Sequence, residues 1–426
     1  MFEPTSLVFI LTVALLLLRA PIFVVLGTPA IYYLWSKGIP LALAPQRLIG
    51  TVNESILLAV PMFMLAGRLM NQFDATTRIF DLAQALVGHI RGGLGFVAVK
   101  ASMIFSAMSG SAAADAVGVG TITVRAMKDR GYDPSFAAAV TLSSATLAPV
   151  VPPSIIMIIY GASANVSIGK LFVGGVLPGL LMSSFLLLTV AYLSWRRQYP
   201  KGEAFCWRRL ATAFSRSLLV LMTPIIIIGG IFTGLFTPTE ASVVAVVYVL
   251  LLGLVYRKIE WKTLYQTLLS TGTAVGALML VVSISGLDAW VIAREQIPQL
   301  LAASVTELTD SKTVVMLLIL AVVLFLGLFM DATPIILMLV PAVMPLVTAF
   351  QIDPIHLGVL FCIMCVVGLI TPPVGIALYG VAMVSNLPIE RVFWASLPFF
   401  VMLLLSLGLM LLVPQIITFL PNLLIS

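Results

Sequence analysis

Two stretches of the sequence decide the fold: Ala148–Ser154 (APVVPPS) and Gly368–Gly375 (GLITPPVG). Each places two consecutive prolines inside a long apolar run. Proline lacks a backbone N–H, and its ring clashes with the carbonyl group one turn earlier, so each pair is expected to interrupt a helix. Each pair is followed by a further proline at the same distance, Pro153 by Pro178 and Pro373 by Pro398. This spacing indicates an internal repeat.

The composition excludes a soluble protein. Of 426 residues, 61% are hydrophobic and 9% are charged, and the mean hydropathy is +1.15. So few charges cannot cover the surface of a soluble protein of this size. The same composition excludes a disordered chain, a nucleic-acid-binding protein and a disulfide scaffold. The apolar runs are too long for the alternating strands, about 10 residues each, of a membrane barrel. The chain is therefore predicted to be an all-α polytopic membrane protein.

The apolar stretches give the expected membrane segments, for which the chain has room for about 12–15. They are Leu7–Leu18, Ile22–Trp35, Ile56–Leu69, Gly93–Val124, Phe136–Ala164, Leu171–Trp195, Leu218–Phe236, Ala241–Val255, Leu268–Leu287, Val314–Phe350, Leu357–Val384 and Val392–Leu424. Some of them are far longer than one crossing requires, and the long ones contain Gly, Pro or Asp near their centres. Such interruptions are typical of broken helices and re-entrant hairpins.

Positive charge predicts which loops face the cytoplasm, because Lys and Arg collect on that side of a membrane. The formal net charge of +6 therefore reflects the basic residues of the cytoplasmic loops and does not indicate an acidic partner. Counting crossings from the basic loop, Gly93–Val124 enters from the cytoplasm and returns to it, whereas Val314–Phe350 enters and leaves from outside. Two hairpins of opposite orientation indicate an inverted repeat. The basic loop that we place in the cytoplasm contains Arg196, Arg197, Lys201, Arg208, Arg209 and Arg216.

The predicted organisation has four parts. Residues 1–70 form N-terminal scaffold helices. Residues 71–195 form the first repeat, with a hairpin at about 93–124 and a broken helix at 136–164. Residues 196–312 contain the basic cytoplasmic loop, central scaffold helices and a connector. Residues 313–426 form the second repeat, with a hairpin at 314–350, a broken helix at 357–384 and a C-terminal helix.

Each break is expected to bind ions. The prolines leave carbonyl groups without N–H partners, and a dehydrated Na⁺ is a suitable partner because hard cations take oxygen ligands. The N-termini of half-helices at the same depth carry free N–H groups and partial positive charge, which suit a carboxylate. Each hairpin tip and its facing break are therefore predicted to hold a cation, and the two together an anionic solute near mid-membrane depth.

A few acidic residues lie within or beside the apolar segments, where ionisable groups are functional candidates. Asp115 and Asp331 each lie near one hairpin tip, and Glu240 lies at a segment edge. Two of them also suit structural roles. Asp115 could cap the returning arm of its hairpin, and Glu240 follows Thr237-Pro238-Thr239 and suits a helix cap.

Other polar residues carry weaker signals. The hydroxyl-rich run Thr141–Thr146 precedes the first Pro-Pro pair, and its side chains suit either cation binding or helix packing; Thr146, next to the break, is favoured as a ligand. The small residues Ser109–Ala114 permit a tight hairpin tip. Lys100 either snorkels or pairs with an acid. Arg294 is a further functional candidate.

With these residues in place, the chain resembles the large membrane (M) subunit of tripartite ATP-independent periplasmic (TRAP) transporters, within the ion transporter superfamily. The resemblance covers essentially the whole chain, with the motifs in the same order. It implies an elevator-type secondary transporter, with a scaffold and a transport domain, in the bacterial inner membrane. The motifs are Ser109–Asp115 (SGSAAAD), Ala148–Ser154 (APVVPPS), Gly230–Ala241 (GIFTGLFTPTEA), Asp331–Pro334 (DATP) and Gly368–Gly375 (GLITPPVG).

The resemblance also implies the ligands and partners. It implies import of a small organic anion, a carboxylate or sugar acid, with Na⁺ as coupling ion and no other cofactor or metal. The implied partners are a small four-helix membrane subunit and a periplasmic solute-binding protein. One implied Na⁺ site comprises Ser109, Gly110, Ser111, Thr146, Val150 and Pro152, and the other comprises Asp331, Thr333, Gly368, Thr371 and Pro372. Asp115 joins them as a candidate sodium or substrate ligand.

Two other functions would require different features. A stand-alone Na⁺/anion symporter of the same superfamily would work without a binding protein. An intramembrane enzyme would need a Ser/His pair, an H-E-x-x-H motif or a paired-Asp G-x-G-D motif, and the sequence has none of these. We therefore expect a transporter rather than an enzyme.

Overall fold

The described chain is helical. The computed structural model describes residues 4–18, 20–373 and 375–425, and within them it has twenty α-helices, one 3-10 helix and no β-strand beyond an isolated bridge between Arg91 and Lys201. The predicted all-α class is confirmed. In chain order the elements are α1 (Pro4–Leu17), α2 (Ile22–Ser36), α3 (Leu43–Val52), η1 (Ser55–Leu58), α4 (Ala59–Gln72), α5 (Ala75–Val87), α6 (Gly93–Ser109), α7 (Ala112–Asp129), α8 (Pro134–Ala145), α9 (Ile155–Ala164), α10 (Ile168–Arg196), α11 (Trp207–Phe232), α12 (Pro238–Val255), α13 (Trp261–Arg294), α14 (Ile297–Leu308), α15 (Lys312–Gly327), α16 (Ala332–Ala349), α17 (Pro354–Leu369), α18 (Ile376–Ser385), α19 (Ile389–Leu412) and α20 (Gln415–Leu424).

Many of these helices suit a membrane. Among the described residues, seven helical stretches are long and apolar enough to cross one, since about 20 residues span the hydrocarbon core. This supports a multi-pass membrane protein. The seven are Ser55–Gln72, Ile168–Arg196, Trp207–Phe232, Pro238–Val255, Trp261–Arg294, Ala332–Ala349 and Ile389–Leu412.

Both predicted helix breaks are present. α8 ends at Ala145 and α9 begins at Ile155, while α17 ends at Leu369 and α18 begins at Ile376. The Pro-Pro peptide bond inside each break is cis. Each predicted hairpin segment also divides into two helices, α6 with α7 and α15 with α16. That these hairpins are re-entrant, and that they enter from opposite sides, remain predictions.

The repeat extends beyond the proline pairs. α8 and α17 both start with Asp-Pro, and the carboxylates of Asp133 and Asp353 accept hydrogen bonds from the N–H two residues later, at 2.9 and 2.8 Å. Proline suits the first helical position because its missing N–H would have no partner there. α9 and α18 both end at an asparagine in the left-handed conformation, Asn165 and Asn386, each with φ of 54°. The equivalent helices therefore begin and end with the same local chemistry.

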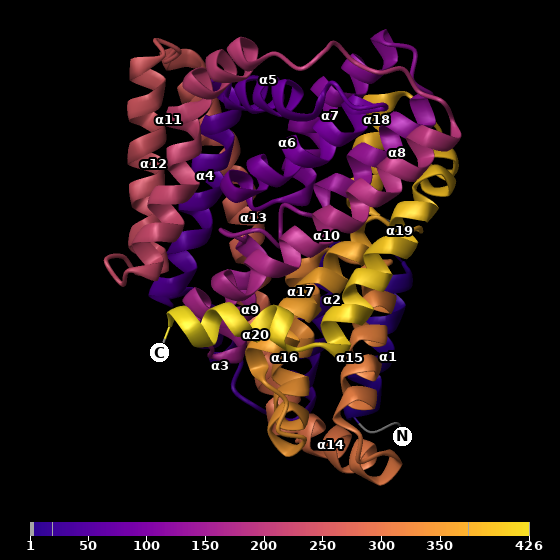
Figure 1. Ribbon diagram of the computed structural model, residues 1–426. Coiled ribbons are helices and arrows are strands. Elements are labelled where there is room, and N and C mark those ends of the chain that lie inside the picture. The colour runs from indigo at the N-terminus through magenta and orange to yellow at the C-terminus, as the bar shows by residue number, and fades with distance from the viewer. Residues whose placement is uncertain (1–3, 19, 374, 426) are drawn as a thin grey trace.

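The two repeats exchange packing partners. Within each repeat, the first hairpin arm packs on the helix before the break, α6 on α8 and α15 on α17. Between repeats, the second arm packs on the helix after the other break, α7 on α18 and α16 on α9 (Figure 1). This exchange holds both hairpins and both breaks in one central unit.

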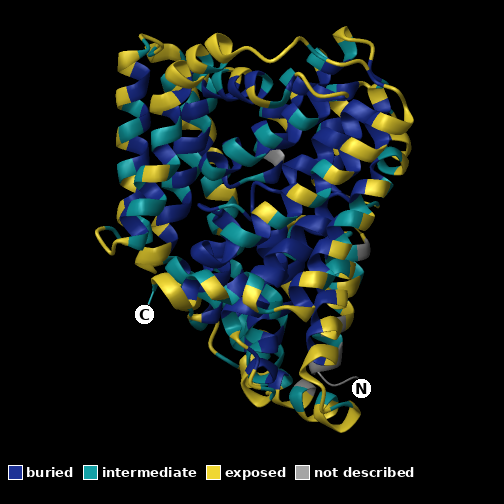
Figure 2. Ribbon diagram, viewed as in Figure 1, coloured by how far each residue is buried: buried dark blue, intermediate teal, exposed yellow. Residues whose placement is uncertain are grey.

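The two helices before the breaks form the centre of the core. Every residue from Ser135 to Ala145 in α8 and from Ile355 to Leu369 in α17 is buried. Figure 2 shows buried positions filling the middle of the molecule and exposed positions along its outer helices and ends. Both helices are therefore covered by protein on all sides. The breaks at the ends of α8 and α17 therefore lie deep in the protein.

The boundaries differ from prediction where charge interrupts an apolar stretch. The chain between the predicted segments Leu268–Leu287 and Val314–Phe350 is largely helical, because α13 continues to Arg294 and α14 follows it. The basic loop is shorter than predicted, since α11 begins at Trp207 and carries three of the arginines assigned to the loop. Charged side chains can extend from the end of a membrane helix into water. An apolar stretch therefore marks only the part of the helix inside the membrane.

Further helices were not predicted as separate elements. α3 and α5 are short and amphipathic, so neither forms a long apolar run. The last apolar segment, expected as one helix, is two, α19 and α20, separated at Val413-Pro414. Proline at this position cannot donate the hydrogen bond that would continue α19.

Candidate functional site

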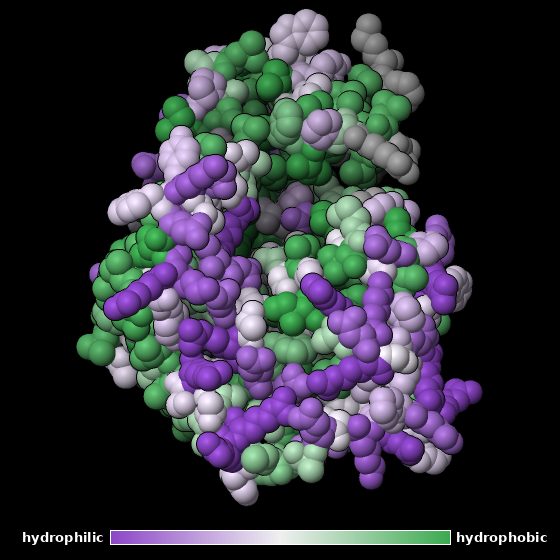
Figure 3. All heavy atoms as spheres, turned by 90° about the horizontal axis from the view of Figure 1, so that it is seen from above, coloured by the Kyte–Doolittle hydropathy of each residue, from purple (hydrophilic) through white to green (hydrophobic). Residues whose placement is uncertain are grey.

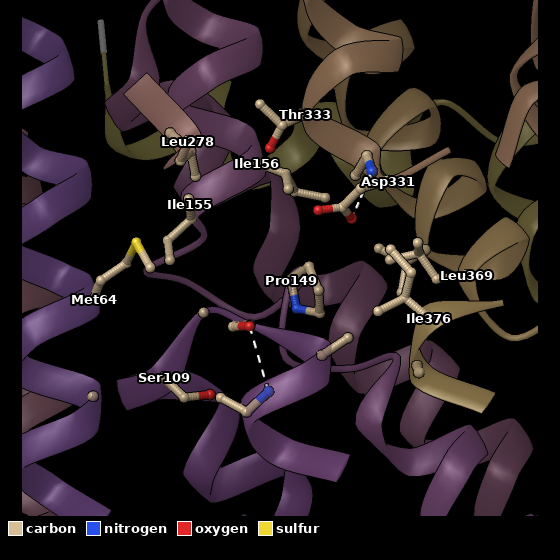
Figure 4. A pocket seen from close by; sticks show the side chains of 18 of the residues that line it. Met64, Ser109, Pro149, Ile155, Ile156, Leu278, Asp331, Thr333, Leu369 and Ile376 are labelled. Carbon is tan, nitrogen blue, oxygen red and sulfur yellow. Dashed lines mark hydrogen bonds between the residues drawn. The ribbon is translucent and has the colours of Figure 1, made fainter. Parts of the chain in front are cut away.

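A cavity of about 340 Å³ lies between the two hairpin tips and the two breaks. Four helices begin at its wall: Ala112 starts α7, Ile155 starts α9, Ala332 starts α16 and Ile376 starts α18, and all four residues line the cavity. In Figure 4, Ser109 and Asp331 approach the cavity from opposite sides. The partial positive charge at four helix N-termini favours an anion in this space.

The first hairpin tip is a tight turn against the first break. α6 ends at Ser109, Gly110 is left-handed with φ of 60°, and the Ser111 hydroxyl caps α7 by accepting a 3.4 Å hydrogen bond from the Ala114 N–H. A Cβ atom on Gly110 would lie 2.7 Å from the carbonyl oxygen of Pro153. The tip therefore contacts the break through its backbone, which only glycine permits.

One polar atom at this tip has no partner. The Ser109 hydroxyl is buried, with 4% of the residue exposed, and has no hydrogen-bond partner among the described residues. A buried hydroxyl without a partner is costly. A bound ion or solute would remove that cost, because Ser109 lines the cavity together with Gly110 and Ser111.

The other predicted ligands of the first Na⁺ site lie behind the cavity wall. Thr146, Val150 and Pro152 are buried within the break and do not line the cavity. The Thr146 hydroxyl donates a 2.6 Å hydrogen bond to the Ser143 carbonyl. The Val150 carbonyl oxygen lies against Gly175 of α10, where a Cβ atom would come within 2.4 Å of it. The structure thus brings the tip and the break into contact but divides the predicted ligands between the cavity and the packed interior.

Asp115 is buried beside the cavity without lining it. It lies in the first turn of α7, 1% exposed, and neither carboxylate oxygen makes a hydrogen bond of ordinary geometry within the described chain. The Ser102 hydroxyl, near this carboxylate, donates its 3.2 Å hydrogen bond to the Ser144 hydroxyl instead. The suggestion that Asp115 caps its helix is wrong, because Ser111 makes the cap.

At the second tip, Asp331 caps α16. Its carboxylate accepts a 2.8 Å hydrogen bond from the Ala332 N–H, and the side chain is exposed to the cavity. Thr333 also lines the cavity and is 7% exposed. The Asp331 carboxylate and the Thr333 hydroxyl therefore place oxygen atoms from two side chains at the second tip.

Three predicted ligands of the second Na⁺ site lie outside the cavity wall. A Cβ atom on Gly368 would lie 2.6 Å from the Cα of Gly327, so α15 and α17 touch through their backbones at this point. The Thr371 hydroxyl donates a 2.9 Å hydrogen bond to the Val367 carbonyl. Neither these residues nor Pro372 line the cavity. At the second break, as at the first, the predicted ligands of the tip line the cavity and those of the broken helix do not.

The remaining sequence candidates lie elsewhere. Glu240 forms a capping box with Thr237 at the exposed start of α12, which agrees with the structural role considered for it. Arg294 ends α13 with its guanidinium 5.2 Å from the centre of the Trp290 ring. Lys100 is half-buried and has no ion pair among the described residues. None of the three lines the cavity.

The basic side chain at this site is not among the residues predicted from the sequence. Arg68 of α4 lines the cavity, and it is the one basic side chain among the described lining residues. Its guanidinium donates a 2.9 Å hydrogen bond to the Ser270 hydroxyl of α13. An arginine near the end of the apolar stretch Ile56–Leu69 is itself a signal, since charged residues in membrane segments mark functional sites.

A cleft adjoins the cavity and shares three residues with it. Arg68, Asn71 and Ala114 line both, and the cleft continues between α4, α5 and α7. α5 lies at one end of the molecule (Figure 1), and the view onto that end shows a hollow bordered on one side by hydrophilic side chains (Figure 3). The cavity is therefore reached from that end. Among the described residues, no cluster of His, Cys, Asp and Glu suits a metal ion held by such side chains.

The sequence matches a known family along most of its length. The family model described as "Tripartite ATP-independent periplasmic transporter, DctM component" matches residues 9–416. The sialic acid TRAP transporter large permease protein SiaM of Vibrio cholerae is 42% identical over 89% of each chain. The C4-dicarboxylate TRAP transporter large permease protein DctM of Pseudomonas aeruginosa is 38% identical over 88% of each chain. The sialic acid TRAP transporter permease protein SiaT of Haemophilus influenzae is 40% identical over 90% of this chain, which spans 62% of that longer protein.

A solved structure shares the fold. The YdaH transporter of Alcanivorax borkumensis superposes with a TM-score of 0.67 over 96% of this chain and 98% of that one, at 15% sequence identity. At this identity the likeness is one of architecture alone. The family model and the close relatives show that this chain belongs to the DctM component family of tripartite ATP-independent periplasmic transporters.

Proposed function

We propose that this chain is the transport subunit that moves a small organic acid across the bacterial inner membrane, driven by Na⁺. The observation that carries the proposal is the meeting of four helix N-termini at one central cavity. Its relatives are transporter permease subunits rather than enzymes, named for sialic acid and C4-dicarboxylates. These compounds share a carboxylate, which is the group that helix N-termini bind well.

Arg68 supplies the second element of anion recognition. Its planar guanidinium offers paired N–H donors that match a carboxylate. The hydrogen bond to Ser270 uses one nitrogen of the guanidinium, Nη1. The other donors are available to a solute in the cavity.

Na⁺ coupling is proposed from the oxygen groups around the tips. At the first tip the Ser109 hydroxyl lacks a partner, and at the second the Asp331 carboxylate faces the cavity. Both breaks add backbone carbonyls without helical partners. In this account each tip binds Na⁺ with its break, and bound Na⁺ offsets the negative charge of Asp331 that would otherwise repel an organic anion.

The proposal includes an elevator-type movement of the two hairpins and two broken helices against a scaffold, together with a small membrane subunit and a periplasmic solute-binding protein. Family membership supports these partners. The central unit formed by partner exchange between the repeats supports rigid-body movement of that unit.

The test is uptake of radiolabelled sialic acid and succinate into proteoliposomes, with and without the small subunit and the binding protein. We expect Na⁺-dependent uptake only with the complete system. Uptake of free substrate by this chain alone would instead establish the stand-alone symporter. The proposal would be refuted if none of the organic acids bound by the binding protein were taken up in a Na⁺-dependent way.

A further inference from the structure

A second cavity, strongly basic, lies between α5 and α11. It measures about 460 Å³ and shares no residue with the central cavity. Four arginines and a single carboxylate, that of Asp81, line it. The described lining therefore has an excess of positive charge. The arginines are Arg78, Arg208, Arg209 and Arg216.

The spacing on α11 directs its basic side chains to one face. Arg208, Thr212 and Arg216 follow one another at intervals of four residues and all line the cavity. Residues four apart lie above one another on a helix. This alignment is possible because α11 begins at Trp207, which makes helix out of a segment that the sequence predicts as loop.

The floor of the cavity is fixed by hydrogen bonds between the two helices. The Arg78 guanidinium donates a 2.8 Å hydrogen bond to the Arg216 carbonyl, and the Ser217 hydroxyl donates a 2.9 Å hydrogen bond to the Arg78 carbonyl. The Arg78 guanidinium also lies 3.8 Å from the centre of the Tyr256 ring. These contacts fix the positions of α5 and α11 relative to each other at the cavity.

Not all of its charge is neutralised by the protein. Arg209 forms an ion pair with Glu203. Partial burial raises the pKa of Asp81, although the charges of Arg209 and Arg216 act in the opposite direction. Arg208 and Arg216 have no ion pair within the described chain. Guanidinium groups gathered in this way provide paired donors for a phosphate.

The residues around the cavity are of the kinds found at a membrane interface. Trp207, the first residue of α11, is 75% exposed, and tryptophan is enriched at membrane interfaces. Beyond Arg216 the helix exposes apolar side chains, among them Leu219 and Ile225. α11 lies at the outer edge of the molecule beside α12 (Figure 1). The arginines therefore lie just outside the hydrocarbon region, on the end where hydrophilic side chains gather (Figure 3).

We propose that this cavity binds the phosphate group of an anionic phospholipid in the leaflet on the basic side of the protein. Basic pockets between helices on that side of a membrane recognise anionic headgroups. A soluble phosphate has the same chemistry, but the exposed apolar side chains of α11 directly below the arginines favour a ligand with acyl chains.

The test uses native mass spectrometry and thermal unfolding of the purified full chain with three probes: dioleoyl-phosphatidylglycerol, dioleoyl-phosphatidylcholine and inorganic phosphate. The site variant is the double substitution Arg208→Gln and Arg216→Gln. The matched control is Arg196→Gln with Lys262→Gln, which removes two exposed basic side chains outside the cavity.

We expect the wild type to retain phosphatidylglycerol in preference to phosphatidylcholine. The site variant should bind phosphatidylglycerol about tenfold more weakly or worse, because each basic residue contributes about 1 kcal/mol at a membrane surface. The control should bind as the wild type does. Equal binding of the two lipids, or equal losses in both variants, would overturn the proposal. If inorganic phosphate raised the unfolding temperature as much as phosphatidylglycerol does, the site would bind a soluble ligand, and the proposal of a phospholipid would be overturned.

Discussion

Gly110 lies directly against Pro153: a Cβ atom on Gly110 would come within 2.7 Å of the Pro153 carbonyl oxygen. The second repeat has its own close contact, in which a Cβ atom on Gly368 would come within 2.6 Å of the Cα of Gly327. In both repeats a hairpin touches a Pro-Pro broken helix through backbone, with no room for a side chain. These contacts hold the helix N-termini around the cavity.

Replacing Gly110 should therefore disturb the site. In Gly110→Ala the new methyl group meets the Pro153 carbonyl, and the left-handed backbone becomes strained, at a cost of about 1–3 kcal/mol. We expect Na⁺-dependent uptake to fall about tenfold or more with the protein still folded, as judged by size-exclusion chromatography. Gly276→Ala in α13 is the matched control, because nothing lies within 4 Å of its Cβ position. Wild-type uptake by Gly110→Ala would show that the contact is unimportant.

Arg68 should determine substrate affinity. Arg68→Gln removes a charged hydrogen-bond donor worth about 1.5–3 kcal/mol, so KM for the organic acid should rise about 10- to 100-fold. Arg68→Lys keeps the charge but loses the planar pair of N–H donors, so its KM should lie between those of the wild type and Arg68→Gln. Arg125→Gln, an exposed residue of α7 outside the cavity, should leave KM unchanged. An unchanged KM in Arg68→Gln would remove Arg68 from substrate binding.

Asp331 should determine the response to Na⁺. Asp331→Asn keeps the shape of the side chain and removes its charge, so the Na⁺ concentration for half-maximal uptake should rise about tenfold or more. The control is Asp129→Asn, at the exposed end of α7. If the Na⁺ dependence of Asp331→Asn matched that of the wild type, the assignment of Asp331 as a Na⁺ ligand would be wrong.

The cavity should open to one side of the membrane at a time. Ala114 lines both the cavity and the adjoining cleft, so Ala114→Cys reports access through that cleft. The background carries Cys206→Ser, since Cys206 is exposed whereas Cys362 and Cys365 are buried. A membrane-impermeant maleimide should label Ala114→Cys from the basic side in the conformation described, and this labelling should change with Na⁺ and substrate. Leu235→Cys, in the exposed turn after α11, is the control that should react only from the other side. Equal labelling of Ala114→Cys from both sides in every condition would indicate a channel.

Local chemistry made much of this fold predictable. Proline breaks a helix wherever it occurs, so both interruptions and the repeat could be recognised from Pro152 and Pro372. The tips could be recognised from the small residues around Gly110 and from Asp331. These signals depend on a few neighbouring residues and not on the packing of distant helices.

What could not be predicted depends on distant packing. That α7 packs on α18 and α16 on α9, which brings four helix N-termini to one cavity, follows from contacts between the repeats. Arg68 could not be recognised as a site residue, because nothing in the apolar stretch Ile56–Leu69 indicates that its last turn faces a cavity. The predicted Na⁺ ligands Thr146 and Thr371 are directed into their own helices by hydrogen bonds to nearby carbonyls, which spacing alone does not reveal.

The most direct measurement of the central claim is accumulation of a labelled organic acid in proteoliposomes that contain this chain, its small membrane subunit and its binding protein. An inward Na⁺ gradient should drive uptake above the external concentration, and collapse of the gradient with a Na⁺ ionophore should abolish it. Under the same gradient Arg68→Gln should need far more substrate and Asp331→Asn far more Na⁺. Uptake that is indifferent to Na⁺, or unchanged in both variants, would contradict the account of a Na⁺-coupled organic anion site between the two hairpin tips.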